Sequence, residues 1–377
     1  MNGKLVLFFI VLAAGPVTKA DDHDPRPDMH GMAAEISALE KFLVSDAEFL
    51  APANEAKIES SLAKLEGHLA HLGQGAFADD PSLKVNLSLL QQHIRDADRA
   101  FREKGKPFAR YMLQSSLQMC VACHTRKKSG DFALPEIDTK GVEPGDLAEY
   151  YFATRQFQKG KELYEREVDG FPRNGIGQSN LRRALLSLAV YYARVKEDPE
   201  AGQKYFAAVG ANDKIPVYLA EESKAWANEF GKWAKAGAGK GDEKLTEVEL
   251  MKRAKALLKN DDFSLVSEMG RSFHVRRLRA SALLHRVLEA PGEKSPTKAE
   301  ALLYLGQIYP RLSSNLFFRF GDMYLKACIT DYPKTSMARS CYVALELAVT
   351  EGFTGSAGTD IPEDEQVELM RLKRIAY

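Results

Sequence analysis

Residues 107–124 read PFARYMLQSSLQMCVACH, and the interpretation of the whole chain starts from this stretch. Phe108, Met112, Ser115 and Met119 recur in it at spacings of three and four residues, which is the period of one face of a helix. The stretch therefore predicts an amphipathic helix that ends in two cysteines and a histidine.

The end of this helix, Cys120-Val121-Ala122-Cys123-His124, has the spacing of a c-type haem attachment site. On a helical turn the two sulfurs point the same way, so each can form a thioether with one vinyl group of the porphyrin. His124 follows directly and is placed as the proximal iron ligand. A redox dithiol is the alternative, whereas a zinc site lacks its second pair of cysteines. The motif predicts one haem c attached covalently to Cys120 and Cys123.

Residues 1–20 have the pattern of a secretory signal peptide. Lys4 supplies the charged start, residues 5–14 form an apolar run, and Thr18 and Ala20 are small residues where a signal peptidase cuts. The run is about half as long as a membrane-spanning helix. We therefore expect export to the periplasm, where haem c is attached. An uncleaved N-terminal anchor is the alternative.

The overall composition is that of a soluble globular protein. Of the 377 residues 45 % are hydrophobic, and 52 basic residues balance 52 acidic ones, which argues against a nucleic-acid partner. Beyond the signal, no apolar stretch is long enough to span a bilayer. Strand-like alternation is scarce, so we predict an all-α fold. The roughly 357 residues left after cleavage are expected to form two or three domains.

Residues 28–128 contain four helical periodicities joined by short connections, which favour an up-down-up-down four-helix bundle. Asp80 and Pro81 are a typical N-cap and first helical residue, and Gly73 and Gly105 are expected helix ends. The residues expected to face inward from the first three helices are Met29, Met32, Ile36, Leu39 and Leu43, then Ile58, Leu62, Leu65, Leu69 and Leu72, then Leu83, Leu87, Leu90, Ile94, Ala97 and Phe101.

Such a bundle, with its C-x-x-C-H motif near the end of the last helix and basic residues just after it, resembles class II cytochromes c. That family includes the high-spin cytochromes c-prime and their low-spin, Met-ligated relatives. The resemblance covers about residues 28–128 and rests on the motif and its position. It implies covalent haem on Cys120 and Cys123, His124 as the proximal ligand, and a distal side of the haem that faces the first helix.

The sixth iron ligand is expected near the start of the first helix. In an up-down-up-down bundle this start lies beside the end of the last helix, which places Met29, His30 and Met32 near the motif. Met32 is the first choice because it lies on the inward stripe, about one turn into the helix. The alternatives are Met29 or His30, methionines that only fill the core, and an open or water-occupied position. A bound methionine predicts an electron carrier, and an open position predicts a gas binder.

His68 and His71 are three residues apart and could share a metal ion. No acidic or cysteine partner for them is evident in the sequence. Leu69 and Leu72 already define the buried face of the same helix, so both histidines are expected to face solvent.

The chain beyond the haem motif has a pattern of small and aromatic residues that resembles tetratricopeptide repeats. In such repeats small residues lie where two helices approach closely, and proline ends the second helix. We expect helical repeats over residues 141–235 and 245–377, with a flexible glycine-rich interruption between them. Any array of helical hairpins would give a similar pattern. The pattern is carried by Ala148, Tyr151, Gly160, Tyr164 and Pro172, by Ala189, Tyr192, Ala201, Tyr205 and Ala208, and by Gly306, Tyr309, Tyr324, Ala327 and Pro333.

A basic segment lies within the second repeat region. We expect it to be the solvated side of an amphipathic helix, and a docking face for an acidic partner is the alternative. Its arginines are Arg271, Arg276, Arg277, Arg279 and Arg286.

Cys328 and Cys341 lie at equal distances from a turn expected near Pro333. Equal distances place them opposite each other in an antiparallel hairpin, and an exported compartment is oxidising. The sequence leaves a disulfide and two buried free thiols as equal alternatives.

Together these features predict an exported monohaem cytochrome that transfers single electrons and whose helical repeats dock a redox partner protein. The alternative is a haem-based sensor or scavenger of nitric oxide or carbon monoxide with an open distal site. A peroxidase-like enzyme is the weakest interpretation, because no distal histidine with a nearby arginine is recognisable. We therefore expect no enzymatic activity, and the sequence does not determine the oligomeric state.

Overall fold

The protein is all-α, as its composition predicts. α-Helices account for most of the residues in the computed structural model, and the strands among them are one short antiparallel pair, β1 (Thr354–Gly355) and β2 (Gly358–Thr359). None of the described helices is long and apolar enough to cross a membrane. The signal segment, residues 1–20, lies outside the described residues, which are 24–43, 46–73, 81–125, 142–237, 245–261, 263, 273–292, 294–312 and 318–377.

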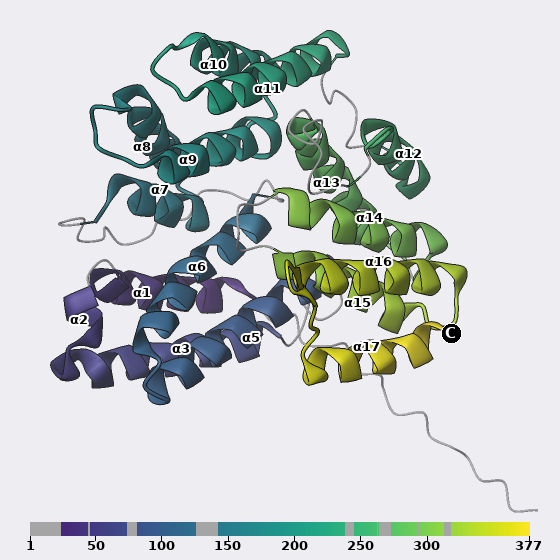
Figure 1. Cartoon of the computed structure of the whole chain (residues 1–377), viewed down its shortest axis with the longest axis horizontal. Helices are drawn as coiled ribbons and strands as arrows, with labels where there is room; N and C mark the ends of the chain where they lie inside the picture. The colour runs from purple at the N-terminus through teal and green to yellow at the C-terminus, as the bar shows by residue number, and fades with distance from the viewer. Residues whose placement is uncertain are drawn as a thin grey trace, which may run out of the picture.

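The first group of helices lies together in Figure 1, and its members share one apolar core. α1 packs on α3, α3 on α5 and α5 on α6, and α1 also contacts α6. Helices that follow each other in the sequence are therefore neighbours in space. The members of this group are α1 (Arg26–Leu43), α2 (Asp46–Leu50), η1 (Pro52–Asn54), α3 (Glu55–Leu72), α5 (Pro81–Arg102) and α6 (Lys106–His124).

Local sequence signals set the ends of these helices. α3 ends at Leu72 with Gly73 as its C-cap, and α5 begins at Pro81, where the fixed φ of proline suits the first helical position. Asp80, its expected N-cap, lies outside the described residues. The short helix α2 is not evident from periodicity. Its Phe49 is fully buried and meets Phe101 edge-on, with 5.4 Å between the ring centroids.

The second group of helices forms successive hairpins and lies above the first group in the view of Figure 1. α7 packs on α8, α8 on α9, and α10 on α11. Gly160 lets α7 and α8 approach closely, because a Cβ at this position would overlap the Phe152 ring and lie 2.9 Å from Ala148 O. The helices of this group are α7 (Pro144–Ala153), α8 (Phe157–Gly170), α9 (Gln178–Val190) with a following π-helical turn η2 (Tyr191–Val195), α10 (Pro199–Ala211) and α11 (Val217–Lys235).

The third group continues the same arrangement of sequential hairpins. α12 packs on α13, α13 on α14, α14 on α15, α15 on α16 and α16 on α17. Gly306 lets α14 and α15 cross closely, since a Cβ there would lie 2.5 Å from Leu325 Cγ. The helices of this group are α12 (Glu247–Leu257), α13 (His274–Glu289), α14 (Pro296–Leu312), α15 (Phe318–Asp331), α16 (Ser336–Gly352) and α17 (Glu363–Ala376).

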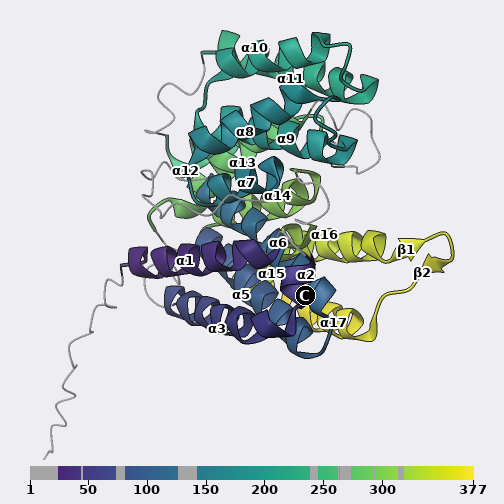
Figure 2. The same ribbon diagram turned by 90° about the vertical axis from the view of Figure 1, so that its left-hand side faces the viewer.

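The third group of helices packs against the first group. α5 contacts both α13 and α15, and Leu89 and Met119 belong to the same apolar cluster as Leu305 and Tyr324 of the third group. Figure 2 shows α1, α3 and α5 at the level of α15 and α17, with α10 and α11 at the far end of the molecule. Segments that are distant in sequence therefore share one core.

α13 runs through the interior, so the prediction of a solvated basic face is wrong for this helix. Every residue in 273–289 is at least partly buried. Arg277 is 3 % exposed and donates to both carboxylate oxygens of Asp261, at 2.7 and 2.8 Å. The guanidinium of Arg279 lies 4.3 Å from the centroid of the Trp233 ring. These arginines are held by intramolecular partners, and Arg271 lies outside the described residues.

Cys328 of α15 and Cys341 of α16 form a disulfide. Their Cα atoms are 6.3 Å apart, and both residues are fully buried. α15 ends at Asp331 and α16 begins at Ser336, so the turn lies where Pro333 predicts it. The structure thus favours the disulfide among the two alternatives that the sequence left.

Loss of this disulfide is expected to lower the free energy of unfolding by about 3 kcal/mol, because it closes a short loop in the unfolded chain. Guanidinium unfolding of the oxidised protein and of the Cys328→Ala/Cys341→Ala double variant measures the difference. Alanine is chosen because both positions are buried. A reductant should shift the midpoint of the wild type and leave that of the double variant unchanged. Equal midpoints for oxidised and reduced wild type would contradict the prediction.

Candidate functional site

The three residues of the predicted haem motif lie in the last turn of α6. At about 100° per residue, Cys120 and Cys123 are about 60° apart around the helix and so share one face. Cys120 is 8 % exposed, and the side chain of Cys123 lies outside the described part of the structure. The helix therefore presents the motif in the register that its spacing predicts.

His124 is oriented by α7. Its Nδ1 is hydrogen-bonded to the carbonyl oxygen of Ala153, the last residue of that helix. A carbonyl oxygen only accepts, so Nδ1 carries the proton and the neutral ring has its lone pair on Nε2. Metal-ligating histidines commonly donate their outer N–H in this way, which fixes the tautomer and the ring orientation. His124 thus makes the second contact that is typical of a metal-ligating histidine.

The surroundings of Cys120 are apolar. Cys120 clusters with Leu117 of α6 and with Tyr150 and Ala153 of α7, and Ile36 of α1 packs against this cluster. The Tyr150 hydroxyl is 2.6 Å from Ser37 Oγ, which ties α7 to α1. Burial raises the pKa of Tyr150, so the phenol stays neutral. The repeat pattern places α7 in the repeats, and nothing in the sequence predicts that this helix covers the motif.

Met32 points inward, as its place on the apolar face of the first helix predicts. It is 6 % exposed and lies in the core of the first helix group, which also contains Met112 of α6. Among the described residues Met32 and Cys120 belong to different clusters, and Ile36 packs against both of them. Met32 is therefore one helical turn along α1 from the residue that reaches the Cys120 cluster.

The other two candidates for the distal position are less enclosed. Met29 packs at the edge of the same core, and His30 is exposed. Met32 is therefore more deeply buried than Met29 and His30. A buried methionine most often only fills core space.

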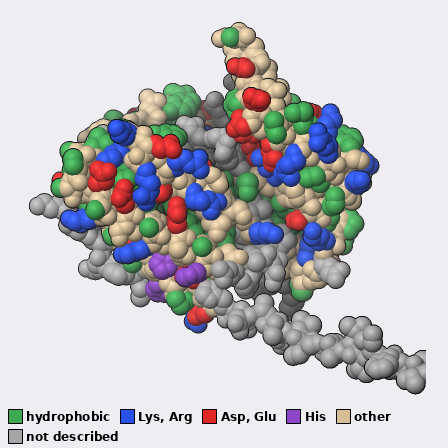
Figure 3. All heavy atoms as spheres, turned by 90° about the horizontal axis from the view of Figure 1, so that it is seen from below, with side chains coloured by type: hydrophobic (Ala, Val, Ile, Leu, Met, Phe, Trp, Pro, Cys, Tyr) green, Lys and Arg blue, Asp and Glu red, His purple; other side chains and the backbone are tan. Residues whose placement is uncertain are grey.

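Asp28 is the acidic partner that the sequence did not reveal for His68 and His71. Its Oδ1 lies 3.0 Å from His68 Nδ1 and 3.5 Å from His71 Nδ1. His71 is exposed, as expected, and His68 is partly buried, with 29 % of its side chain exposed. Figure 3, which views the molecule from below, shows histidine side chains gathered at one place on the surface. Within the described residues, no group of three or more His, Cys, Asp or Glu could hold a metal ion.

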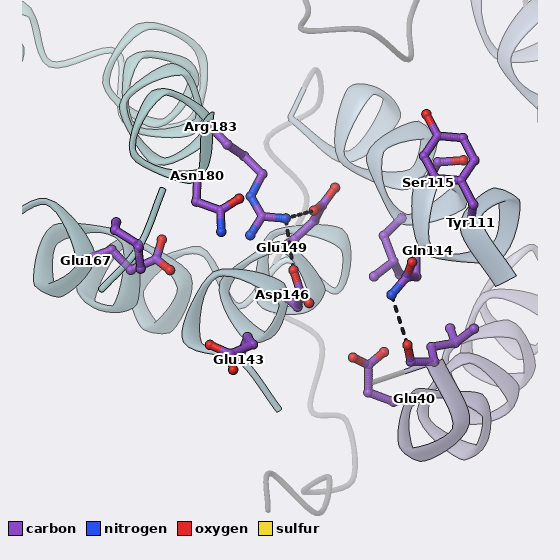
Figure 4. Close-up of a pocket in the computed structure, with 13 residues that line it drawn as sticks. Glu40, Tyr111, Gln114, Ser115, Glu143, Asp146, Glu149, Glu167, Asn180 and Arg183 are labelled. Carbon is purple, nitrogen blue, oxygen red and sulfur yellow. Dashed lines mark hydrogen bonds and ion pairs between the residues drawn. The ribbon is translucent and has the colours of Figure 1, made fainter. Parts of the chain in front are cut away.

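A pocket of about 340 Å³ is lined by α1 and α6 on one side and by α7, α8 and α9 on the other (Figure 4). Arg183 of α9 contributes a guanidinium to the described part of the pocket lining. Nη1 of Arg183 donates to Asp146 Oδ1 at 2.9 Å and lies 3.5 Å from Glu149 Oε2. Leu117 lines the pocket as well as packing on Cys120, so the pocket adjoins the haem motif. The carboxylates of the lining are Glu40, Glu143, Asp146, Glu149 and Glu167, and we call this site the acidic pocket.

Three carboxylates of the acidic pocket are buried, namely Glu40, Glu149 and Glu167, and the pKa values of Glu40 and Glu167 are raised. Glu40 is 4 % exposed, and its Oε2 has no hydrogen-bond partner among the described residues. Burial, reinforced by the charges of Asp146 and Glu149, raises the pKa of Glu40 to about 7. Glu167 is also 4 % exposed with an unpartnered Oε2, and burial raises its pKa although Arg183 opposes the shift. Figure 4 shows Glu40 reaching from α1 toward the side that carries Asp146.

Comparison with other proteins does not assign this chain to a family. No family model matches it, and no match is found among curated proteins or among solved structures.

Glu40→Gln is expected to stabilise the protein at neutral and alkaline pH. The pKa of Glu40 is raised from 4.5 to about 7, so the folded protein keeps a proton that the unfolded chain releases. The stability of the wild type should therefore fall as the pH rises through this window. Glutamine does not titrate, and its gain should reach at most about 3 kcal/mol above the folded-state pKa.

Thermal unfolding measured between about pH 5 and pH 8 tests this expectation. Glu35→Gln is the matched control on the same helix, because Glu35 pairs with Lys64 at 3.0 Å outside the pocket lining. Parallel stability profiles for Glu40→Gln and the wild type would show that the carboxyl of Glu40 does not titrate in this window.

Proposed function

We propose that the protein is an exported monohaem c-type cytochrome that transfers single electrons. Haem c would be attached to Cys120 and Cys123, with His124 as the proximal iron ligand. The observation that carries this proposal is the Cys-x-x-Cys-His sequence at the end of α6, combined with the hydrogen bond that His124 Nδ1 donates to Ala153 O. The first supplies the thioether and iron ligands, and the second leaves Nε2 as the ligating nitrogen.

The layout that we propose is a haem bundle similar to class II cytochromes c, followed by tetratricopeptide-like repeats. The bundle would consist of α1, α3, α5 and α6, which share one apolar core. The repeats would occupy residues 141–235 and 245–377, where successive helices pack as hairpins. Residues 1–20 would direct the chain to the periplasm.

The residues around the motif suit a buried porphyrin. When bound, haem supplies an iron that alternates between the ferric and ferrous states. Leu117 and Ile36 would exclude water from it, and Tyr150 closes the cluster from the side of α7. Met32 is our proposed distal ligand, because a thioether opposite histidine favours ferrous iron and raises the reduction potential.

The helical repeats would dock a redox partner protein. Large exposed apolar side chains often mark protein-contact surfaces. The last two helices carry four that are more than half exposed, namely Val343 and Leu347 on α16 and Val367 and Met370 on α17. α16 and α17 pack against each other, so the proposed docking surface spans both helices.

A second candidate function is a haem-based sensor or scavenger of nitric oxide or carbon monoxide. The observation that favours it is the separation of Met32 and Cys120 into different clusters of the described residues. If Met32 stays in the bundle core, the distal side of the iron is open to a gas. The sixth ligand therefore decides between the two functions.

Covalent attachment predicts that haem colour stays with the protein through acid denaturation and organic extraction. Cys120→Ala and Cys123→Ala should each weaken attachment, because each variant removes one thioether. The matched control is the Cys328→Ala/Cys341→Ala double variant, which should keep its haem. Haem that extracts freely, or an unchanged protein mass after expression with haem-maturation machinery, would refute attachment.

Ligation by Met32 predicts that ferrous protein binds carbon monoxide slowly or not at all. The ferric protein should show the weak near-infrared charge-transfer band from sulfur to iron. Met32→Ala should abolish the band and open the iron to carbon monoxide, whereas Met29→Ala should change neither property. A wild-type protein that is high-spin and binds carbon monoxide at once would favour the gas-binding function instead.

A further inference from the structure

We propose that the acidic pocket binds a small organic polycation, an alkyl diamine or polyamine. Glu40 on α1 would pair with one end of the molecule, and Glu167 on α8 with the other. Neither Cys120 nor His124 is among the described residues that line the pocket, and the inference does not depend on the haem.

The charge of the pocket selects a cation. Among the described residues, its lining carries five carboxylates against one guanidinium, and Arg183 is already engaged with Asp146 and Glu149. A ligand that brought negative charge would meet repulsion from the remaining carboxylates. A ligand with ammonium groups would compensate for them.

Two buried acceptors in the lining lack partners. Glu40 and Glu167 are each 4 % exposed, and the Oε2 atom of each has no hydrogen-bond partner among the described residues. A buried polar atom left unsatisfied costs about 1–3 kcal/mol, and more when the group is charged. Ammonium N–H groups would supply the missing donors. These two atoms come from different parts of the chain, so they indicate a ligand that bridges α1 and α8.

The arrangement suits an organic cation better than a metal ion. Nowhere in the described part of the chain do three or more His, Cys, Asp or Glu form a group that could hold a metal. The pocket volume of about 340 Å³ is far more than one ion occupies, and it lies at the small end of the range of roughly 300–1,000 Å³ for ligand pockets. Carboxylates on opposite walls match a molecule with a positive charge at each end (Figure 4).

The α6 wall fits the middle of such a molecule. Leu117 and Tyr111 offer apolar surface for a methylene chain, and Tyr111 is 51 % exposed. Gln114 donates its Nε2–H to Leu43 O at 2.9 Å, which fixes the amide so that its oxygen can accept from an ammonium. Charged ends and an apolar middle are the properties of an alkyl diamine.

Isothermal titration calorimetry of the full-length exported protein tests the proposal, with 1,4-diaminobutane and spermidine as probes. Both should bind at a single site, and butylamine, which has one ammonium, should bind more weakly. Glu40→Gln and Glu167→Gln should each weaken diamine binding by about tenfold or more, the effect of losing one hydrogen bond to a charged group. Glu40→Gln is informative because the loss of a buried charge is expected to stabilise the fold, so weaker binding would not reflect unfolding.

Glu35→Gln on α1 is the matched control and should bind the diamines as the wild type does. Undetectable binding of both probes would overturn the proposal. So would equal affinities of the wild type and both pocket variants, or a magnesium ion that binds in the pocket and is not displaced by spermidine.

Discussion

The contact between the end of α6 and α7 is the interaction on which the rest of the molecule depends. On one side of it the Ala153 carbonyl holds His124, and Ala153 packs with Cys120. On the other side the first turns of α7 carry Asp146 and Glu149 into the acidic pocket. One helix therefore orients the predicted iron ligand and also forms a wall of the proposed cation site. A shift of α7 relative to α6 would alter both sites together.

The buried ion pair of Arg277 with Asp261 and the buried carboxyl of Glu40 differ in whether their polar atoms have partners. Arg277 and Asp261 are almost completely buried and satisfy each other through two hydrogen bonds, at 2.7 and 2.8 Å. Such a pair offsets the loss of hydration by its geometry. Glu40 has comparable burial but an unpartnered Oε2 among the described residues, and acidic neighbours raise its pKa further. The proposed cation would supply the donor that this carboxyl lacks.

The sequence predicted what is local and missed what is distant. Helix ends at Gly73 and Pro81 follow from the backbone preferences of single residues, and apolar spacing identified the buried faces of the first helices. The spacing of apolar residues does not reveal which element covers a face. The contact of Asp28 with His68 and the buried ion pair of Arg277 with Asp261 could therefore not be predicted. The acidic pocket was missed for the same reason, because its walls come from five helices. One signal was available, namely three carboxylates at intervals of three residues in the segment 143–149.

If both proposals hold, the two sites are coupled, and electrostatics determines the sign. Leu117 contributes to the acidic pocket and to the cluster around Cys120, so a bound polycation would lie one layer of side chains from the haem. A positive charge at that distance destabilises ferric iron more than ferrous iron, because the ferric centre carries the additional positive charge. Cation binding would therefore raise the reduction potential, and linkage requires that reduction tighten cation binding by the same factor. Because Arg183 already places one guanidinium beside Asp146 and Glu149, the acidic wall is partly neutralised before any ligand arrives. The size of the coupling would thus depend chiefly on Glu40 and Glu167, the two carboxylates whose Oε2 atoms have no partner among the described residues.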